Sequence, residues 1–384
     1  MMKKYAVVIL LLLAFGATFC HAQTIRVTVT NRGAFVREGE VVALRWSELK
    51  KKLPSLDPQS AIVLDESGKD SLVLQNTERD LLFQADFKPK EARSFIIKNA
   101  PANRRHIESL VDGRFVLPRE DYAWENDRIA FRMYGPAMAK DVNNGIDVWT
   151  KRVRYLIVQK WYKESEGSPP GKDTYHIDRG EGADFFSVGK SLGAGSCAIW
   201  KHGKVFQPGV FSSYRTLTNG PLRVSFELSY DSLDVQGAVY KEVMRITLDA
   251  GQNLNKIEVT YFGPVKNVGM EFASGLVKRK NTNIFRNKQE CWISLWGETN
   301  DDPANGFLGT AVVLPPSAYR AMAEDNDQYL MVGKTRSGQT ATYYAGAGWT
   351  RSGDFASVED WNRYVEGFAR RIRSPLKIRM IVKK

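Results

Sequence analysis

Most of the chain consists of short runs in which apolar and polar residues alternate, and this pattern constrains the fold more than any other feature. Near the start, Ile25, Val27 and Val29 alternate with polar neighbours. Longer runs of the same kind follow over 222–230, 239–248 and 256–262. Such alternation is typical of antiparallel strands with one covered face, whereas parallel strands need connecting helices, which the sequence does not show. The sequence therefore predicts an all-β fold, an antiparallel sandwich with few short helices.

The few helical signals lie outside these runs. One apolar stripe at helical spacing runs through Val358, Trp361, Val365, Phe368 and Ile372. Ser357 is a suitable N-cap for this helix, and Pro375 ends it. We also expect short helices over 46–53 and 316–325, and a strand over 153–162.

The length of 384 residues favours two to three domains. We predict a signal peptide over 1–22, a small N-terminal β domain over 23–105 and a larger, carbohydrate-active β domain over 106–384. Lys3 and Lys4 precede the apolar run of the signal peptide, and Ala22 suits cleavage. Lipid anchoring at Cys20 is the less favoured alternative, because Phe19 before it is bulky. No later segment is long and apolar enough to span a membrane, so we expect a periplasmic or extracellular protein.

The two cysteines that remain after cleavage, Cys197 and Cys291, permit a disulfide in an exported protein. We favour two buried thiols in strands. No cluster of cysteine and histidine has zinc spacing, and no motif indicates a cofactor.

The formal net charge of +12 indicates acidic partners, and it is +10 without Lys3 and Lys4. The basic runs are short and no nucleic-acid motif is present. Nine tryptophans suit sugar recognition, so an acidic oligosaccharide or polysaccharide is the preferred partner. The alternative is that the charge confers only solubility. No feature predicts an oligomeric state.

The densest polar cluster lies over 173–186 and supplies most of the candidate catalytic residues. His176 and Asp178 share a face on an extended segment, so that the carboxylate can tune the imidazole as a general base or acid. Glu181 and Asp184 are candidates for the paired carboxylates of glycoside hydrolysis. Arg179 in the same segment is a candidate substrate-binding residue. The alternative is a solvated loop whose acids form turns or hold a structural calcium ion.

A second cluster begins at Trp124 and runs into a predicted strand. Tyr134 is its candidate catalytic residue, and Arg128 and Arg132 can clamp a sugar carboxylate. Further candidate sugar-binding residues are Trp124, Trp149, Trp200, His202 and Trp349. The alternative is that Trp124 is a core residue and Arg128 pairs with Asp127.

Several of these motifs together resemble a family of exported bacterial proteins described as domain of unknown function 4861. They are the segments 124–128, 132–136, 175–182, 188–193 and 346–349, whose sequences are WENDR, RMYGP, YHIDRGEG, VGKSLG and GAGW. The resemblance covers nearly all of the chain after residue 22. It implies a galactose-mutarotase-like supersandwich and a place in polysaccharide-degradation systems that act on uronic-acid polymers, without supplying catalytic residues.

Three functions remain open at this stage. The first is cleavage of uronic-acid-containing oligosaccharides. We favour hydrolysis by two of Asp178, Glu181 and Asp184 because these acids cluster. Elimination by a lyase, with His176 or Tyr134 as the base and an arginine stabilising the developing charge, is its rival. The second is carbohydrate binding without catalysis, and the third is a mutarotase or epimerase.

Overall fold

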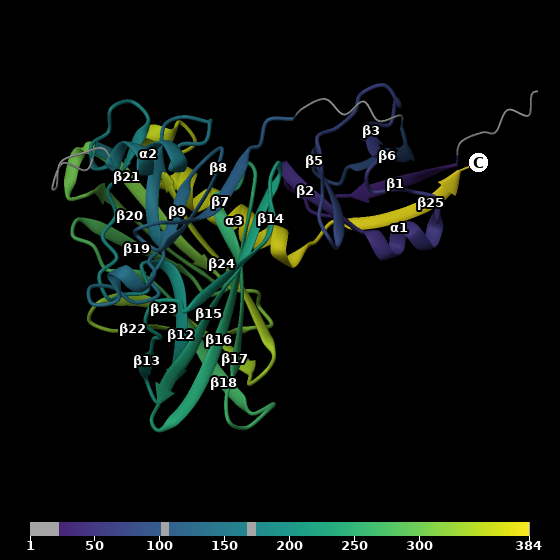
Figure 1. The fold of residues 1–384 in the computed structure, drawn as a ribbon. Helices are drawn as coiled ribbons and strands as arrows, with labels where there is room; N and C mark the ends of the chain where they lie inside the picture. Colours follow the sequence, from purple (N-terminus) through teal and green to yellow (C-terminus); the bar gives the residue numbers. More distant parts are fainter. Residues whose placement is uncertain (1–22, 101–106, 167–173, 384) are drawn as a thin grey trace, which may run out of the picture.

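The computed structural model describes residues 23–100, 107–166 and 174–383 (Figure 1), and the predicted signal peptide with Cys20 lies outside them. Every ladder between the named strands is antiparallel, which confirms the all-β prediction. The described residues contain no helix long and apolar enough to cross a membrane.

Two small sheets form the N-terminal part of the fold, and the short helix α1 (Trp46–Lys52) packs on their shared core. The sheet of order β25-β1-β6-β3 contains Lys377–Lys383, Thr24–Thr30, Ala92–Asn99 and Ala61–Leu64. The sheet of order β2-β5-β4 contains Arg37–Arg45, Asp80–Phe87 and Leu74–Asn76. The predicted alternation is confirmed, because Ile25, Val27 and Val29 are all fully buried between these sheets.

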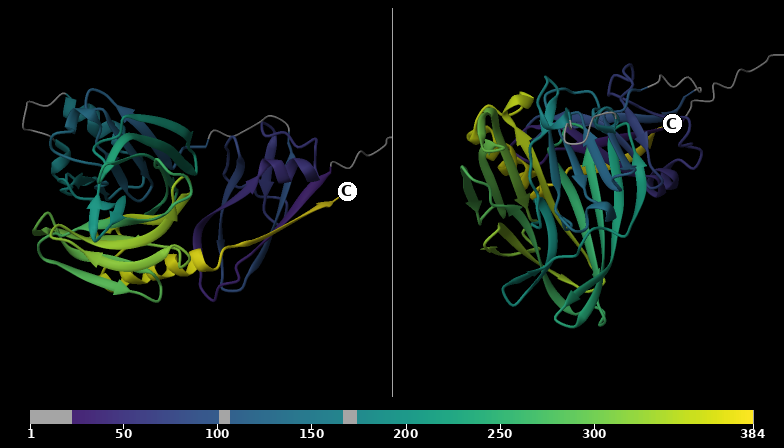
Figure 2. Two further views of the ribbon diagram at one scale, coloured as in Figure 1. Left: turned by 90° about the horizontal axis from the view of Figure 1, so that it is seen from below. Right: turned by 60° about the vertical axis from the view of Figure 1, so that its left-hand side comes forward.

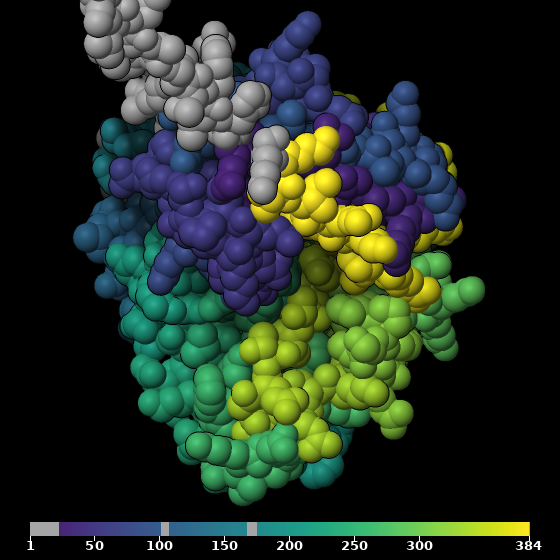
Figure 3. Space-filling model, turned by 90° about the vertical axis from the view of Figure 1, so that its right-hand side faces the viewer, coloured from purple at the N-terminus to yellow at the C-terminus, as the bar shows by residue number. Residues whose placement is uncertain are grey.

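The last strand of the chain joins the first one. In β25, Lys383 lies opposite Thr24 and Lys377 lies opposite Thr30, so the strand extends the N-terminal sheet. Figure 3 shows these C-terminal residues in yellow against the purple N-terminal ones. The predicted domain 23–105 did not include this strand.

Three further sheets build the larger part of the fold (Figure 2). The sheet of order β11-β10-β9-β8-β7 contains Gly182–Asp184, Asp147–Lys151, Ala130–Met133, Asp121–Asn126 and Val111–Val116. The sheet of order β13-β12-β18-β23-β22 contains Lys204–Phe206, Ala194–Lys201, Gly269–Val277, Gln328–Arg336 and Tyr319–Glu324. The eight-stranded sheet of order β14-β15-β16-β17-β24-β21-β20-β19 contains Ser213–Asn219, Arg223–Val235, Ala238–Asp249, Leu254–Phe262, Thr340–Trp349, Asp302–Val313, Trp292–Thr299 and Thr282–Asn287.

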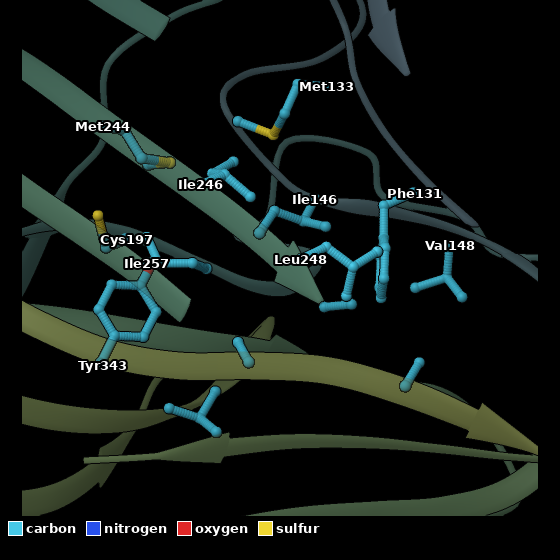
Figure 4. Close-up of a cluster of buried hydrophobic side chains, with 14 of the residues drawn as sticks. Phe131, Met133, Ile146, Val148, Cys197, Met244, Ile246, Leu248, Ile257 and Tyr343 are labelled. Atoms are coloured by element: carbon cyan, nitrogen blue, oxygen red, sulfur yellow. The ribbon is translucent and has the colours of Figure 1, made fainter. Parts of the chain in front are cut away.

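The largest hydrophobic core lies between the eight-stranded sheet and the two five-stranded sheets. Figure 4 shows Phe131 and Val148 from one side of this core near Leu248 from the other. The outer face of the eight-stranded sheet is covered by α3 (Val358–Arg373), whose Trp361 and Val365 pack on it. The predicted helix and its Ser357 cap, which accepts the Asp360 N–H, are confirmed.

Two expected elements differ in the structure. The segment predicted as a helix over 316–325 contains strand β22, which pairs with β23. The strand predicted over 153–162 is wrong, because residues 153–157 form no strand and α2 (Val158–Glu166) follows them. The Glu125 carboxylate accepts the main-chain N–H groups of Ile157 and Val158 and thereby stabilises the start of this helix.

Both cysteines are free and buried, as predicted. Cys197 lies in β12 as expected, but Cys291 lies in the turn before β20 with a positive φ of 57°.

Candidate active site

A pocket of about 450 Å³ brings together four of the predicted site residues. Arg132 comes from β9, Tyr134 follows this strand, and Asp184 ends β11. His176 ends the short 3₁₀ helix η2 (Thr174–His176). The remaining lining residues are Phe185, Phe186, Ser187, Val188, Gly189 and Asn300.

Arg132 is the centre of the charge network at the base of this pocket. It is 4% exposed, and the sheet register places it directly opposite Asp147 of β10. Its Nε and Nη2 donate to Asp147 Oδ2 at 2.9 and 2.6 Å, and Nη2 donates to Asp184 Oδ2 at 2.8 Å. Two buried carboxylates therefore share one guanidinium group.

Burial and this sharing shift the pKa values of both carboxyl groups. Burial, and then the neighbouring charge of Asp147, raise the pKa of Asp184 well above its usual range, and Arg132 offsets this only in part. Burial also raises the pKa of Asp147, which Arg132 opposes. Because like charges this close do not both ionise easily, the protonated form of Asp184 is favoured, which makes this residue a candidate general acid.

His176 lies beside this acid. Its Nδ1 is 3.0 Å from the main-chain oxygen of Asp184 and 3.7 Å from Asp184 Oδ2, and its side chain is 48% exposed. If Nδ1 donates to that carbonyl group, the basic lone pair of the neutral ring is on Nε2. The geometry therefore pairs an imidazole base with a carboxylic acid.

Tyr134 is held by the same network. Its hydroxyl group accepts a hydrogen bond from Arg132 Nη2 at 2.8 Å and donates one to Asp147 Oδ2 at 3.2 Å. Burial raises the pKa of Tyr134. A phenol that keeps its proton in this way is a poor base, so His176 is the better candidate for that role.

Asp178 does not line the pocket. It accepts the main-chain N–H groups of Gly180 and Gly182 and pairs with Arg152 and Arg351. Although burial alone acts in the opposite direction, these hydrogen bonds hold the pKa of Asp178 below its usual value. Asp178 thus stabilises the turn that the two glycines make with positive φ angles.

Glu181 also lies outside the pocket. Its carboxylate accepts from Lys160 Nζ at 2.7 Å and from the Tyr155 hydroxyl group. Burial opposes the effect, but the hydrogen bond from Lys160 lowers the pKa of Glu181. The three clustered acids of the sequence are therefore separated, and only Asp184 reaches the pocket.

The tryptophans predicted to bind sugar are mostly core residues. Trp124, Trp149 and Trp349 are fully buried, so their indole faces are closed to a ligand. Trp124 Nε1 donates to Asn255 Oδ1, and Trp349 Nε1 donates to the Asn305 carbonyl group. Trp200 packs partly buried on the second five-stranded sheet.

The remaining predicted binding residues lie outside the pocket lining. His202 occupies the exposed turn between β12 and β13, with a φ of 50°. Arg128 pairs with Asp354 and Asp127, as the alternative reading expected in part. Arg179 is exposed.

Sequence reasoning missed Asp147 and Asn300. Asp147 begins a strand, and only the pairing of β9 with β10 places it against Arg132. Asn300 lies in the β20–β21 turn, far from the others in sequence. Among the described residues, no group of three or more His, Cys, Asp or Glu side chains is arranged to hold a metal ion.

Comparisons with known proteins give one family and a fold. The family model described as "Domain of unknown function (DUF4861)" matches residues 29–378. "Uncharacterized protein P7" of Formosa agariphila (strain DSM 15362 / KCTC 12365 / LMG 23005 / KMM 3901 / M-2Alg 35-1) is 32% identical over 320 residues, which are 78% of this chain and 77% of that protein.

Two solved structures share the fold at 10% identity. One is titled an alpha-mannosidase from Enterococcus faecalis V583, with a TM-score of 0.53 over 94% of this chain and 46% of that chain. The other is titled a protein in the Glycosyl Hydrolase Family 38 from Enterococcus faecalis, with a TM-score of 0.50 over 93% of this chain and 47% of that chain. This chain thus spans about half the length of either protein, and the likeness concerns the fold.

Proposed function

Since this chain belongs to the DUF4861 family, we propose that it is a carbohydrate-active enzyme that cleaves uronic-acid-containing oligosaccharides. The active site is the pocket lined by Arg132, Tyr134, His176 and Asp184. The observation that carries the proposal is the imidazole beside a buried carboxylic acid, 3.7 Å apart at the pocket wall.

This pair suits β-elimination. His176 Nε2 removes the proton on the carbon next to the uronate carboxylate. The bond from the adjacent ring carbon to the glycosidic oxygen then breaks, a ring double bond forms, and Asp184 gives its proton to the departing oxygen. No water is consumed, and the products are a new reducing end and an unsaturated uronate.

Hydrolysis is the second candidate, favoured because the two structures that share the fold are an alpha-mannosidase and a protein in the Glycosyl Hydrolase Family 38. It calls for a second carboxylate facing the substrate. Asp147 is the nearest candidate through Arg132, but it is fully buried and does not line the pocket. Asp178 and Glu181 are engaged in ion pairs elsewhere. Elimination therefore accords better with the groups that line the pocket.

The test is product analysis of the purified protein with trimers of galacturonate, glucuronate and mannuronate. We expect new reducing ends that appear together with ultraviolet absorbance of an unsaturated uronate. Asp184→Asn and His176→Ala should each lower kcat at least about 100-fold, as loss of a general acid or base does. Asp178→Asn is the matched control, and it should keep most activity in folded protein.

Other outcomes distinguish the alternatives. Reducing ends without absorbance would replace elimination by hydrolysis. Binding of a trimer without products would support a carbohydrate-binding protein, and a changed anomer or epimer ratio with intact bonds would support a mutarotase or epimerase.

A further inference from the structure

The predicted arginines of the pocket region already have carboxylate partners. Arg132 donates to Asp147 and Asp184, and Arg128 pairs with Asp354 and Asp127. A substrate carboxylate in the pocket would therefore compete with these internal carboxylates for either guanidinium group. Charge selectivity calls for a cation that lacks such a partner.

Arg279 is a cation of this kind. It follows β18, and its Nη1 and Nη2 donate to the main-chain oxygens of Glu298 and Leu308 at 3.2 and 2.9 Å. Its Nε is enclosed and has no hydrogen-bond partner among the described residues. Within that same part of the chain, no carboxylate comes within ion-pair distance of it. A partly buried charge without a counterion is costly, and this cost calls for an explanation.

The guanidinium group lies behind one wall of the pocket. Its Cζ is 5.8 Å from the ring centroid of Phe186, which lines the pocket. Glu298, whose main-chain oxygen it contacts, is two residues before Asn300, another lining residue. Phe186 therefore lies against both the guanidinium group of Arg279 and the ligand space, which places this charge close to the pocket.

Arg279 remains charged at neutral pH. Burial lowers its pKa to about 10, and the more distant charge of Asp301 raises it slightly. Its field is thus present under the conditions in which the pocket would bind substrate.

We propose that Arg279 is the charge-selecting residue of the pocket, where its positive field favours sugars that carry a carboxylate over neutral sugars of the same shape. The inference rests on the proposed function and specifies its substrate class. Because Arg279 does not line the pocket and reaches it only past Phe186, its effect is on binding selectivity and not on the chemical step.

The test uses trimers of galacturonate, glucuronate and mannuronate, each paired with its methyl ester, which removes the charge and keeps the ring. Dissociation constants are measured by calorimetry for the wild type, for Arg279→Gln and for Arg336→Gln. Arg336 in β23 is exposed and donates a hydrogen bond to the Asn267 carbonyl group near the other end of β18. Arg336→Gln has the same net charge as Arg279→Gln and is therefore the matched control. We expect Arg279→Gln to lower affinity for the charged trimer roughly five-fold relative to its ester. The control should leave that ratio unchanged.

An unchanged ratio in Arg279→Gln would overturn the inference. If that variant does not fold, Arg279→Lys retains the charge and must retain the ratio, and loss of selectivity in this variant would also overturn it. A wild type that binds acid and ester equally removes the inference but leaves the proposed function standing. A wild type that binds neither form of any trimer removes both.

Discussion

At the residue scale, the site depends on a carboxylate that never touches the ligand space. Asp147 is fully buried, but it holds both Arg132 and Tyr134. Its charge also raises the pKa of Asp184. Asp147 is therefore a positioning residue that also favours the protonated form of Asp184.

Replacing Asp147 gives a pH-dependent prediction. In the proposed mechanism Asp184 acts in its protonated form, so activity should fall on the alkaline side as the pH passes the raised pKa of this group. Asp147→Asn removes the charge that raises this pKa and leaves Arg132 less compensated. Both effects favour ionised Asp184, so the alkaline limb of kcat/KM should move to lower pH. A limb that stays in place or moves to higher pH would contradict this assignment.

A second buried acid lies far from the pocket. Glu242 is fully buried, with Oε1 3.9 Å from Cys197 Sγ and Oε2 without a hydrogen-bond partner among the described residues. Burial raises the pKa of Glu242 well above 4.5. Folding therefore favours the neutral acid.

This burial makes stability fall with rising pH. The folded pKa exceeds the unfolded one, so the favourable contribution is complete below about pH 4.5 and is lost as pH rises toward the folded pKa. Glu242→Gln should remove this slope and raise the free energy of unfolding at pH 8. Urea unfolding at pH 5 and pH 8 measures it. Glu227→Gln is the control with the opposite expectation. Arg245 and Arg215 lower the pKa of Glu227 against the effect of burial, so the loss of this carboxylate should lower the free energy of unfolding.

At the element scale, β4 connects the N-terminal sheets to the eight-stranded sheet through one side chain. Gln75 is 2% exposed. Its Nε2 donates to Thr218 Oγ1 and the Arg223 carbonyl group, and its Oε1 accepts from the Leu222 and Arg223 N–H groups. Both polar atoms of the Gln75 side chain therefore form hydrogen bonds across the junction of β4 with β14 and β15.

Truncating this side chain should destabilise the whole protein. Gln75→Ala removes the acceptor of the Leu222 and Arg223 N–H groups, which costs about 2–4 kcal/mol in the free energy of unfolding, whereas the Arg223 carbonyl group still accepts the Gly220 N–H. The exposed Gln59→Ala serves as the comparison and should change it by less than about 0.5 kcal/mol. Chemical denaturation decides, and equal effects of both variants would show that the junction is not stabilised by Gln75.

At the scale of the whole molecule, the first and last described strands, β1 and β25, form an antiparallel pair. Leu376, just before β25, and Ile378 and Met380 within it pack on the core of the N-terminal sheets, although they follow α3 on the eight-stranded sheet (Figure 2). The fold is thus closed by pairing between residues about 350 positions apart.

Removing residues 375–384 should loosen the N-terminal sheets first. About 3 kcal/mol of apolar contact is lost, and β1 becomes an edge strand. Hydrogen exchange of the amides in β1 should accelerate strongly, whereas exchange in β16 should change little. Ile381→Ser, at an exposed position of the intact strand, is the control. Unchanged protection of β1 would contradict this view of the fold.

The sequence by itself determined many of the strands and the α3 helix, because period-two and period-3.6 patterns follow from burying one face of an element. It also identified Arg132, Tyr134, His176 and Asp184, since such side chains are chemically conspicuous. It did not determine which of the clustered acids reach the pocket. Asp178 forms an ion pair with Arg351, and Glu181 forms one with Lys160, so neither carboxylate lines the pocket.

Only the tertiary structure decided these pairings, as it decided that Asp147 opposes Arg132 and that β25 joins β1. The physical reason is that register, ion pairing and burial depend on residues that are distant in sequence, and a local pattern carries no information about them. The fully buried tryptophans show the same limit, because composition indicates how many indoles a chain has but not which faces remain open.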